Sequence, residues 1–527
     1  MSTNPLLQTD KLPDFNSIRA EHIEPAIDQL LRENREQIQS LLHADRKCTW
    51  DNTIQPLEEL EDRLNRTWSA VSHLHAVADN EELRKAYNAC LPRLSDYSTD
   101  LGQNRELYEA YRTIGKSGEY SRLSTAQQRI IDHALRDFRL SGIDLNEKDK
   151  NRYREIQQAL SKLQTRFEEN LLDATHGWKK HVTDETLLAG LPDSVLALAR
   201  QSAGKDNLEG WLFTLDFPSY MPVMQYADNR NLREEMYRAY VTRASELGSN
   251  PAQWDNSKIM EEIIDLRQQL ARILGYPGYA HYSLAKKMAS NPEEVITFLT
   301  DLAKRSRPVA QRDLEELEHF ARKEHGVKKL EAWDIAYYSE KLRKHKFNLS
   351  QEELRQFFPV PQVIEGLFAV VNRLYGLSIM PRNNIAIWHE DVCFYDIYDE
   401  ENTLRGSFYL DLYARKNKRG GAWMDECVVR KKTASGVQTP VAYLTCNFTP
   451  PIGNNPSLLT HDEVTTLFHE FGHGLHHMLT RVDYPGVAGI NGVPWDAVEL
   501  PSQFMENWCW ERESLDLVAR HYKSGET

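Results

Sequence analysis

His469-Glu470-Phe471-Gly472-His473 is the stretch from which the fold and chemistry of this sequence are most directly inferred, because it has the pattern HExxH. Five of the 18 histidines fall between positions 461 and 477. Thr460 followed by Glu463 forms a capping box, so a helix is expected to begin at His461 and to run to about Thr480. Apolar residues recur along this segment at helical spacing and predict one buried face.

The pattern points to a metal centre. On one helix His469 and His473 lie a turn apart, offset by about 40°, so their imidazoles can bind one ion. Glu470 then points beside the metal, where its carboxylate can take a proton from a metal-bound water. Gly472 supports a functional interpretation, because glycine inside a helix costs about 1 kcal/mol relative to alanine and usually marks a close approach. The alternative interpretation is an exposed helix that happens to be rich in histidine.

A catalytic zinc site needs a third protein ligand and an open position for water. The metzincin pattern HExxHxxGxxH is absent, because His476 and Leu479 occupy the positions of its glycine and last histidine. His476 lies one turn beyond His473, too far along a straight helix to join the same ion, and is kept as a candidate on the substrate side.

The third ligand is expected downstream, where a Gly-rich connection leads to a second helix. Glu499 follows His473 by 26 residues, which leaves room for a loop that returns an antiparallel helix beside the first. Asp496 and Asp483 remain alternatives for the third ligand. Asp496, one turn before Glu499, better suits an acceptor that orients an imidazole.

The rest of the sequence predicts a mainly α protein. To about residue 380, apolar residues recur three and four positions apart with charges between them. Between residues 385 and 448, aromatic and β-branched runs predict a small antiparallel sheet, with strands near 392–398, 406–413 and 441–448. We expect three regions: 1–220 and 221–384, both helical, and 385–527, which combines strands with the HExxH helix.

Composition excludes several classes of protein. The chain of 527 residues has a formal net charge of −14, which argues against sequence-independent binding of nucleic acid. No run approaches 18 apolar residues, and the first ten residues lack the features of a signal peptide. Six scattered cysteines without a CxxC argue against a disulfide framework. We therefore expect a soluble, cytoplasmic protein that binds neither nucleic acid nor a membrane.

Two longer stretches carry a resemblance to a known family. Residues 469–476, HEFGHGLH, followed by residues 498–508, VELPSQFMENW, closely resemble the thimet-oligopeptidase family of zinc metallopeptidases. Residues 405–413, 419–423 and 229–240 match as well, and the resemblance runs from Asn4 to Glu526. It implies a two-lobed, zincin-like helical body with a deep channel, a small sheet beside the active-site helix, and zinc at the channel floor.

Site residues follow from the resemblance position by position. His469, His473 and Glu499 would hold one Zn²⁺ per chain, and Glu470 would be the general base. The strand at 441–448 would be the sheet edge that pairs with the substrate backbone, through Val441, Ala442, Tyr443 and Leu444.

The implied function is zinc-dependent hydrolysis of internal bonds in short, unstructured peptides, including released signal peptides, by an enzyme that is expected to be a monomer. Family members continue for well over a hundred residues beyond the position of Thr527, with tyrosines and a histidine that bind the oxyanion. We therefore expect this chain to be truncated. The alternatives are a zinc-binding remnant with little or no activity and a helical interaction scaffold with an accidental HExxH.

Overall fold

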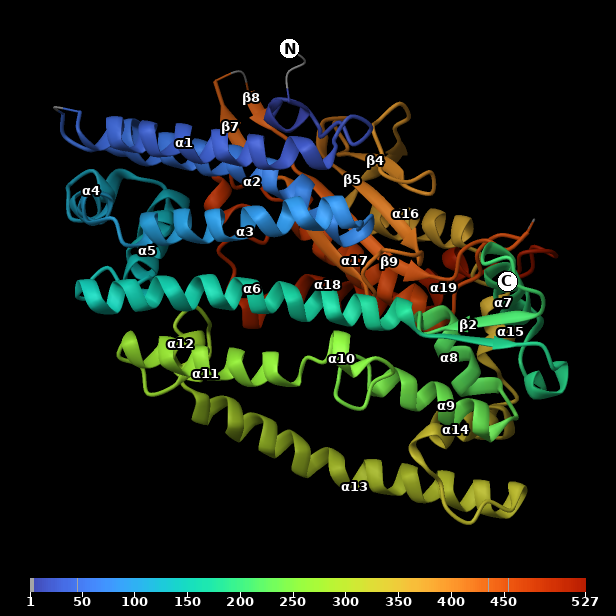
Figure 1. The fold of residues 1–527 in the computed structure, drawn as a ribbon. Helices are drawn as coiled ribbons and strands as arrows, with labels where there is room; N and C mark the ends of the chain where they lie inside the picture. Colours follow the sequence, from blue (N-terminus) through green and yellow to red (C-terminus); the bar gives the residue numbers. More distant parts are fainter. Residues whose placement is uncertain (1–3, 45, 435, 454) are drawn as a thin grey trace.

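The computed structural model describes residues 4–44, 46–434, 436–453 and 455–527 and is mainly helical (Figure 1). Four long helices lie side by side in layers. In this stack α1 (Ile23–Leu42) packs on α3 (Glu81–Gly102), α3 packs on α6 (Glu147–Gly177), and α6 packs on α11 (Ser257–Ile273). The expectation of a mainly α protein is confirmed.

The other helices and the strands of the described part follow in chain order. The helices are α2 (Gln55–Val77), α4 (Arg105–Gly115), α5 (Thr125–Leu140), α7 (Asp193–Lys205), α8 (Phe217–Tyr226), α9 (Arg230–Val241), α10 (Pro251–Trp254), α12 (Tyr279–Leu284), α13 (Pro292–His325), α14 (Ala332–Phe347), α15 (Gln351–Arg355), α16 (Val360–Tyr375), α17 (His461–Met478), α18 (Leu500–Glu506) and α19 (Arg512–Val518). The strands are β1 (Lys179–Val182), β2 (Trp211–Thr214), β3 (Ser378–Pro381), β4 (Cys393–Tyr398), β5 (Leu404–Tyr413), β6 (Trp423–Val428), β7 (Lys431–Thr433), β8 (Gly436–Gln438) and β9 (Val441–Phe448).

Helix α6 illustrates how local sequence sets these elements. The Asn146 side chain accepts a hydrogen bond from the backbone N–H of Asp149 at 3.0 Å and caps the N-terminus. Tyr153, Ile156 and Leu160 then fall at three- and four-residue spacing and are buried on one face. A polar cap followed by an amphipathic stripe is sufficient to explain where this helix begins and which face it buries.

Five strands form one sheet in the order β3-β4-β5-β9-β6. Strands β4, β5 and β9 lie where the sequence predicted them. The sheet is antiparallel, as expected, except between β5 and β9, which pair in parallel. Between these two strands the chain first forms β6 and the β7–β8 hairpin, so it enters β9 in the direction of β5.

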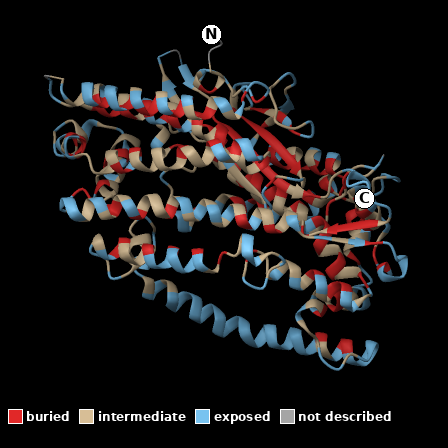
Figure 2. Cartoon of the chain, viewed as in Figure 1, coloured by how far each residue is buried: buried red, intermediate tan, exposed pale blue. Residues whose placement is uncertain are grey.

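The hydrophobic cores divide the molecule into two lobes. The sheet lobe (residues 4–143 and 358–527) buries Trp50 and Tyr443 in one cluster on the N-terminal helices, and Val363 and Phe471 in another. The helical lobe (residues 145–347) contains smaller, separate clusters. Figure 2 shows burial concentrated in the sheet, while the middle of α13 is exposed. Two of these clusters cross residue 220 or residue 384, and the division into the regions 1–220, 221–384 and 385–527 stays a prediction.

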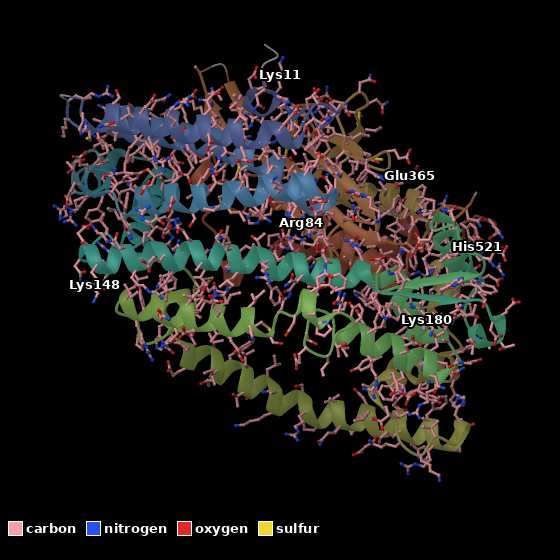
Figure 3. The ribbon with its side chains drawn as sticks, viewed as in Figure 1. Lys11, Arg84, Lys148, Lys180, Glu365 and His521 are labelled. Carbon is pink, nitrogen blue, oxygen red and sulfur yellow. The ribbon has the colours of Figure 1, made fainter. Side chains whose placement is uncertain are left out.

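Ion pairs join the two lobes along α3 and α6. Arg84 on α3 lies between these helices (Figure 3) and donates hydrogen bonds to Asp173 on α6 at 2.8 Å and to Asp79 at 3.0 Å. Together with the packing of α3 on α6, this contact fixes one lobe against the other.

Two expectations from composition can be compared with the structure. Within the described residues, no helix is both long and apolar enough to span a membrane. All six cysteines carry free thiols, as their scattered positions predicted.

Candidate active site

Helix α17 carries the HExxH motif and begins as predicted. The Thr460 hydroxyl accepts a hydrogen bond from the backbone N–H of Glu463 at 3.2 Å, and the Glu463 carboxylate accepts one from the N–H of Thr460 at 2.8 Å. The helix buries its apolar face against the sheet, where the rings of Phe471 and Phe408 meet edge to face at 5.3 Å. The side of α17 that carries His469 and His473 therefore points away from this packing and faces Glu499.

The structure brings together His469, His473 and Glu499. One carboxylate oxygen of Glu499 lies 3.2 Å from Nε2 of His469 and 3.0 Å from Nε2 of His473. One candidate ligand atom from each residue lies within 4.8 Å of the others, and among the described residues this is the group that could hold a metal ion. Glu499 directly precedes α18, which packs beside α17. The expected loop and returning helix therefore exist.

Gly472 is where the two helices approach most closely. A Cβ atom added there would lie 2.6 Å from the carbonyl oxygen of Pro501 and 2.7 Å from Cα of Ser502. These neighbours are backbone atoms at the start of α18, so they cannot move without displacing Glu499. The glycine in the motif is required by this contact.

We expect Gly472→Ala to lower the free energy of unfolding by about 2 kcal/mol, because overpacking against backbone outweighs the gain in helix propensity of about 1 kcal/mol. Chemical denaturation measures this change. Gly204 in α7 is the matched control, since an added Cβ there meets nothing within 4 Å. Gly204→Ala should be neutral or stabilising, and equal effects at the two positions would contradict the proposed contact.

Two further side chains hold the candidate ligands in place. Glu506 at the end of α18 lies 2.6 Å from Nδ1 of His469. Because a carboxylate accepts, the imidazole donates from Nδ1 and its Nε2 lone pair faces Glu499 and His473. Ser502 donates a hydrogen bond to the Glu499 carboxylate at 2.8 Å. Sequence reasoning missed Glu506, although it follows Glu499 by seven residues, two helical turns on the same face.

Glu470 is 6% exposed and sits beside the candidate ligands. Burial raises the pKa of its carboxyl to about 7 against the opposing effect of His469, with a further rise from the charge of Glu499. The backbone N–H of Met424 on β6 donates a hydrogen bond to this carboxylate and lowers the pKa. The arrangement places a proton acceptor with a near-neutral pKa between the histidines and the edge of the sheet.

Three other predicted residues lie elsewhere. Asp496 does not orient an imidazole: its carboxylate accepts hydrogen bonds at 3.0 Å from the backbone N–H groups of Met288 and Ala289. Asp483, the other alternative ligand, pairs with Arg430 at 2.8 Å. His476 stays outside the metal-competent group and lines an apolar cavity between α17 and α18.

The expected substrate edge is wrong. Val441, Ala442, Tyr443 and Leu444 belong to β9, which pairs with β5 on one side and β6 on the other. Both rows of backbone groups are therefore occupied over these residues. Strand β6 is the outer strand on this side of the sheet, and it is the strand whose Met424 contacts Glu470.

An acidic cavity of about 380 Å³ lies between α2, the second half of β6 and residues 485–491. Its carboxylates are those of Glu58, Glu61, Asp62, Asp425 and Glu426. Asp62 pairs with Lys431, and Glu426 accepts from Asn491 at 3.1 Å. Burial, together with repulsion from Glu61, raises the pKa of Glu58 from 4.5 to about 7, and the N–H of Gly486 opposes this.

This shift has a consequence for stability. Folding favours protonated Glu58, so its contribution is complete below about pH 4.5 and is lost as the pH rises through 7. We expect Glu58→Gln to raise the free energy of unfolding by about 3 kcal/mol at pH 8.5, which corresponds to the rise of the pKa from 4.5 to about 7 at roughly 1.4 kcal/mol per pKa unit, and to leave it unchanged at pH 4. Denaturation at both pH values tests this. Glu59→Gln, at an exposed position on α2, is the control, and a pH-independent effect of Glu58→Gln would refute the prediction.

Comparison with known proteins shows where the chain belongs. Residues 223–527 match the model of Peptidase family M3, and residues 27–150 match that of the Neurolysin/Thimet oligopeptidase N-terminal domain. Oligopeptidase A of Escherichia coli (strain K12) is 56% identical over 525 residues, which cover 99% of this chain and 77% of that protein. Organellar oligopeptidase A of Arabidopsis thaliana is 42% identical over 542 residues, covering 100% of this chain and 68% of that protein.

The fold has a relative among solved structures. PZ peptidase A with inhibitor 2 superposes with a TM-score of 0.56 at 16% identity, covering 96% of this chain and 71% of the other. Similarity along the whole chain favours an active peptidase over an inactive remnant. The HExxH helix, the returning glutamate and these matches agree: the chain belongs to Peptidase family M3 and is a metallopeptidase of the oligopeptidase type.

Proposed function

We propose that His469, His473 and Glu499 hold one zinc ion per chain, and that Glu470 is the general base in hydrolysis of internal bonds in short, unstructured peptides. The observation that carries the proposal is the grouping of three ligand atoms within 4.8 Å beside a buried carboxylate. Two imidazoles and one carboxylate are the ligand set of many catalytic zinc sites, which keep a position open for water. The names of the relatives support peptides as substrates.

Each residue has a distinct task in this mechanism. Bound zinc would supply Lewis acidity toward the peptide carbonyl and the attacking water. Glu506 fixes the tautomer and orientation of His469, and Ser502 fixes the carboxylate of Glu499. Glu470 takes a proton from the attacking water and passes it to the leaving amine. Strand β6 is the outer strand of the sheet beside Glu470, so an extended peptide can lie along the start of this strand.

We also propose that the enzyme works as a monomer in the cytoplasm. The three candidate ligands and the base come from one chain, so the site needs no residue from a partner. Free thiols at all six cysteines suit a reducing compartment.

Zinc titration tests the proposed function. Protein stripped with a chelator should regain hydrolysis of a quenched fluorescent peptide as zinc is added, and activity should level off at one zinc per chain. Hydrolysis that does not respond to zinc, or none at any zinc concentration, would refute the proposal.

A further inference from the structure

A buried histidine on α17 has no task in the mechanism above. His477 follows His473 by four residues, is fully buried, and lies outside the group that could hold a metal ion. Burying an imidazole is costly unless its nitrogens find partners. The partners of His477 therefore indicate what this residue does.

Both ring nitrogens of His477 face oxygen atoms of β6. Nε2 lies 3.0 Å from the carbonyl oxygen of Val428, and Nδ1 lies 3.1 Å from a carboxylate oxygen of Glu426. In the part of the chain that the structure describes, Nδ1 has no other hydrogen-bond partner. A neutral imidazole has one N–H group and one lone pair, so it can satisfy only one of these oxygens. A ring that carries hydrogen on both nitrogens satisfies both contacts and forms an ion pair with Glu426.

His477 meets β6 at an irregularity in the strand. Glu426 pairs with Ala442 of β9 and Val428 pairs with Val441, which leaves Cys427 as an extra residue. Such a β-bulge interrupts the ladder of backbone hydrogen bonds, and bulges are over-represented next to active sites. The imidazole thus binds β6 where its pairing with β9 is disturbed.

The connection between α17 and Glu499 closes over the same pair. The Asn491 side chain donates to both carboxylate oxygens of Glu426 at 3.1 Å. Gly489 has a φ of +62°, and a Cβ atom added there would lie 2.8 Å from Nδ1 of His477. The pair therefore holds three segments together: the end of α17, the second half of β6 and residues 488–491.

The charged groups around the pair favour a positive imidazole. Glu426 belongs to the wall of the acidic cavity, and the negative potential of the other carboxylates there favours an imidazolium over a neutral ring. Arg66 of the same cavity and His476 on α17 are the groups that oppose it; burial and then the charge of His477 lower the pKa of His476. The other carboxylates are those of Glu58, Glu61, Asp62 and Asp425.

The second half of β6 determines where its first residues lie. Strand β6 is the outer strand of the sheet, with β9 as its neighbour. Met424, whose backbone N–H donates to Glu470, precedes Glu426 by two residues, or about 7 Å at 3.3 Å per residue. A displacement of Glu426 therefore moves the start of β6, along which the peptide is proposed to lie.

We propose that His477 is a positioning residue for peptide binding: as a buried imidazolium paired with Glu426, it fixes β6 against α17 and so sets the place of the strand along which the peptide lies. Its contacts among the described residues are with β6 and not with the candidate ligands or Glu470, so it acts through the strand. The inference rests on the proposed function, because it takes β6 as the strand beside the bound peptide.

Glu426→Gln removes the charge and keeps the size of the side chain. The glutamine can still accept from Asn491 and can pair with a neutral His477, so the fold is expected to be retained. We expect KM for a quenched fluorescent peptide to rise about tenfold, the effect of exchanging a charge-assisted contact for a neutral one, while kcat stays within about twofold. Zinc should stay at one per chain, because the candidate ligands are not altered.

Glu61→Gln is the matched control. Glu61 lines the same acidic cavity from α2 and contributes the same charge, but among the described residues it is not a partner of His477. Its variant should keep the KM of the parent chain. Equal rises in KM for the two variants would assign the effect to attraction of a positively charged peptide by the cavity, and would overturn the role of His477.

His477→Gln and the double variant locate the effect in the pair. Two residues that act as one unit show non-additive changes. The single variant His477→Gln should also raise KM about tenfold, and the double variant should show roughly the same tenfold rise. A rise of about a hundredfold in the double variant would mean that the two residues act independently, and would overturn the proposal.

Neutron diffraction from a crystal of the perdeuterated parent chain tests the protonation without any variant. Deuterium is expected on both Nδ1 and Nε2 of His477 at the pH of the assay. A bare Nδ1 would overturn the proposed ion pair. This measurement decides the matter even where a variant fails to fold.

The kinetic outcomes are equally decisive. Unchanged KM in Glu426→Gln, a fall in kcat alone, or loss of zinc would each overturn the positioning role. Any of these results together with intact zinc-dependent hydrolysis by the parent chain would leave the proposed function standing.

Discussion

Glu470→Gln is expected to lower kcat by roughly 10³–10⁴-fold while zinc stays at one per chain, because the amide cannot accept the proton of the attacking water. Glutamine keeps the size of the side chain, and Glu470 is not among the residues proposed to bind zinc. Hydrolysis of a quenched peptide, measured beside metal content by atomic spectrometry, gives both quantities.

The control for this variant is Glu511→Gln, an exposed residue outside the site, which should hydrolyse the peptide at the parent rate. Unchanged hydrolysis by a zinc-loaded Glu470→Gln protein would show that the proton acceptor is another group.

Glu499→Ala is expected to abolish zinc binding and, with it, hydrolysis. The two histidines alone leave the ion without its third protein ligand, and three such ligands are the usual minimum for a catalytic zinc site. Zinc content after gel filtration should fall from one per chain to below about 0.1, and added zinc should not restore activity.

Asp496→Asn is the matched comparison for this variant. Asp496 lies three residues from Glu499 but binds the backbone of Met288 and Ala289, so the variant should keep its zinc. If Glu499→Ala keeps one zinc, Glu499 is not the third ligand. If Asp496→Asn loses its zinc, Asp496 has a role in metal binding that this account does not give it.

Signals contained within one helix could be read from the sequence. The capping box of Thr460 and Glu463, the spacing of His469 and His473, and the presence of Gly472 all act over a few residues, and the structure reproduces each of them. The partner of Gly472 could not be inferred in the same way, because the start of α18 reaches it only through the fold.

The prediction of the substrate edge was wrong because the exposure of a strand depends on its place in the sheet. Strand β9 was expected at the edge, but it is buried along nearly its whole length, from Val441 to Phe448. A continuous apolar run of this kind is typical of a central strand. Strand β6 has two acidic residues, Asp425 and Glu426, and a weaker strand pattern, and it is the strand at the edge.

The remaining differences between the predicted site and the structure involve contacts between residues far apart in the sequence. Asp496 meets Met288 across 208 residues of sequence, and no local pattern predicts that pairing. Glu506 was detectable, since it follows Glu499 by two turns, at the end of the helix that begins directly after this third candidate ligand. A search for carboxylates at that spacing would have identified the residue that orients His469.

Anomalous X-ray diffraction at the zinc edge tests the central claim most directly. A crystal of the zinc-loaded chain should show one peak, about 2.0–2.2 Å from Nε2 of His469, Nε2 of His473 and a carboxylate oxygen of Glu499. No peak at that position, or a peak held by other residues, would contradict the account.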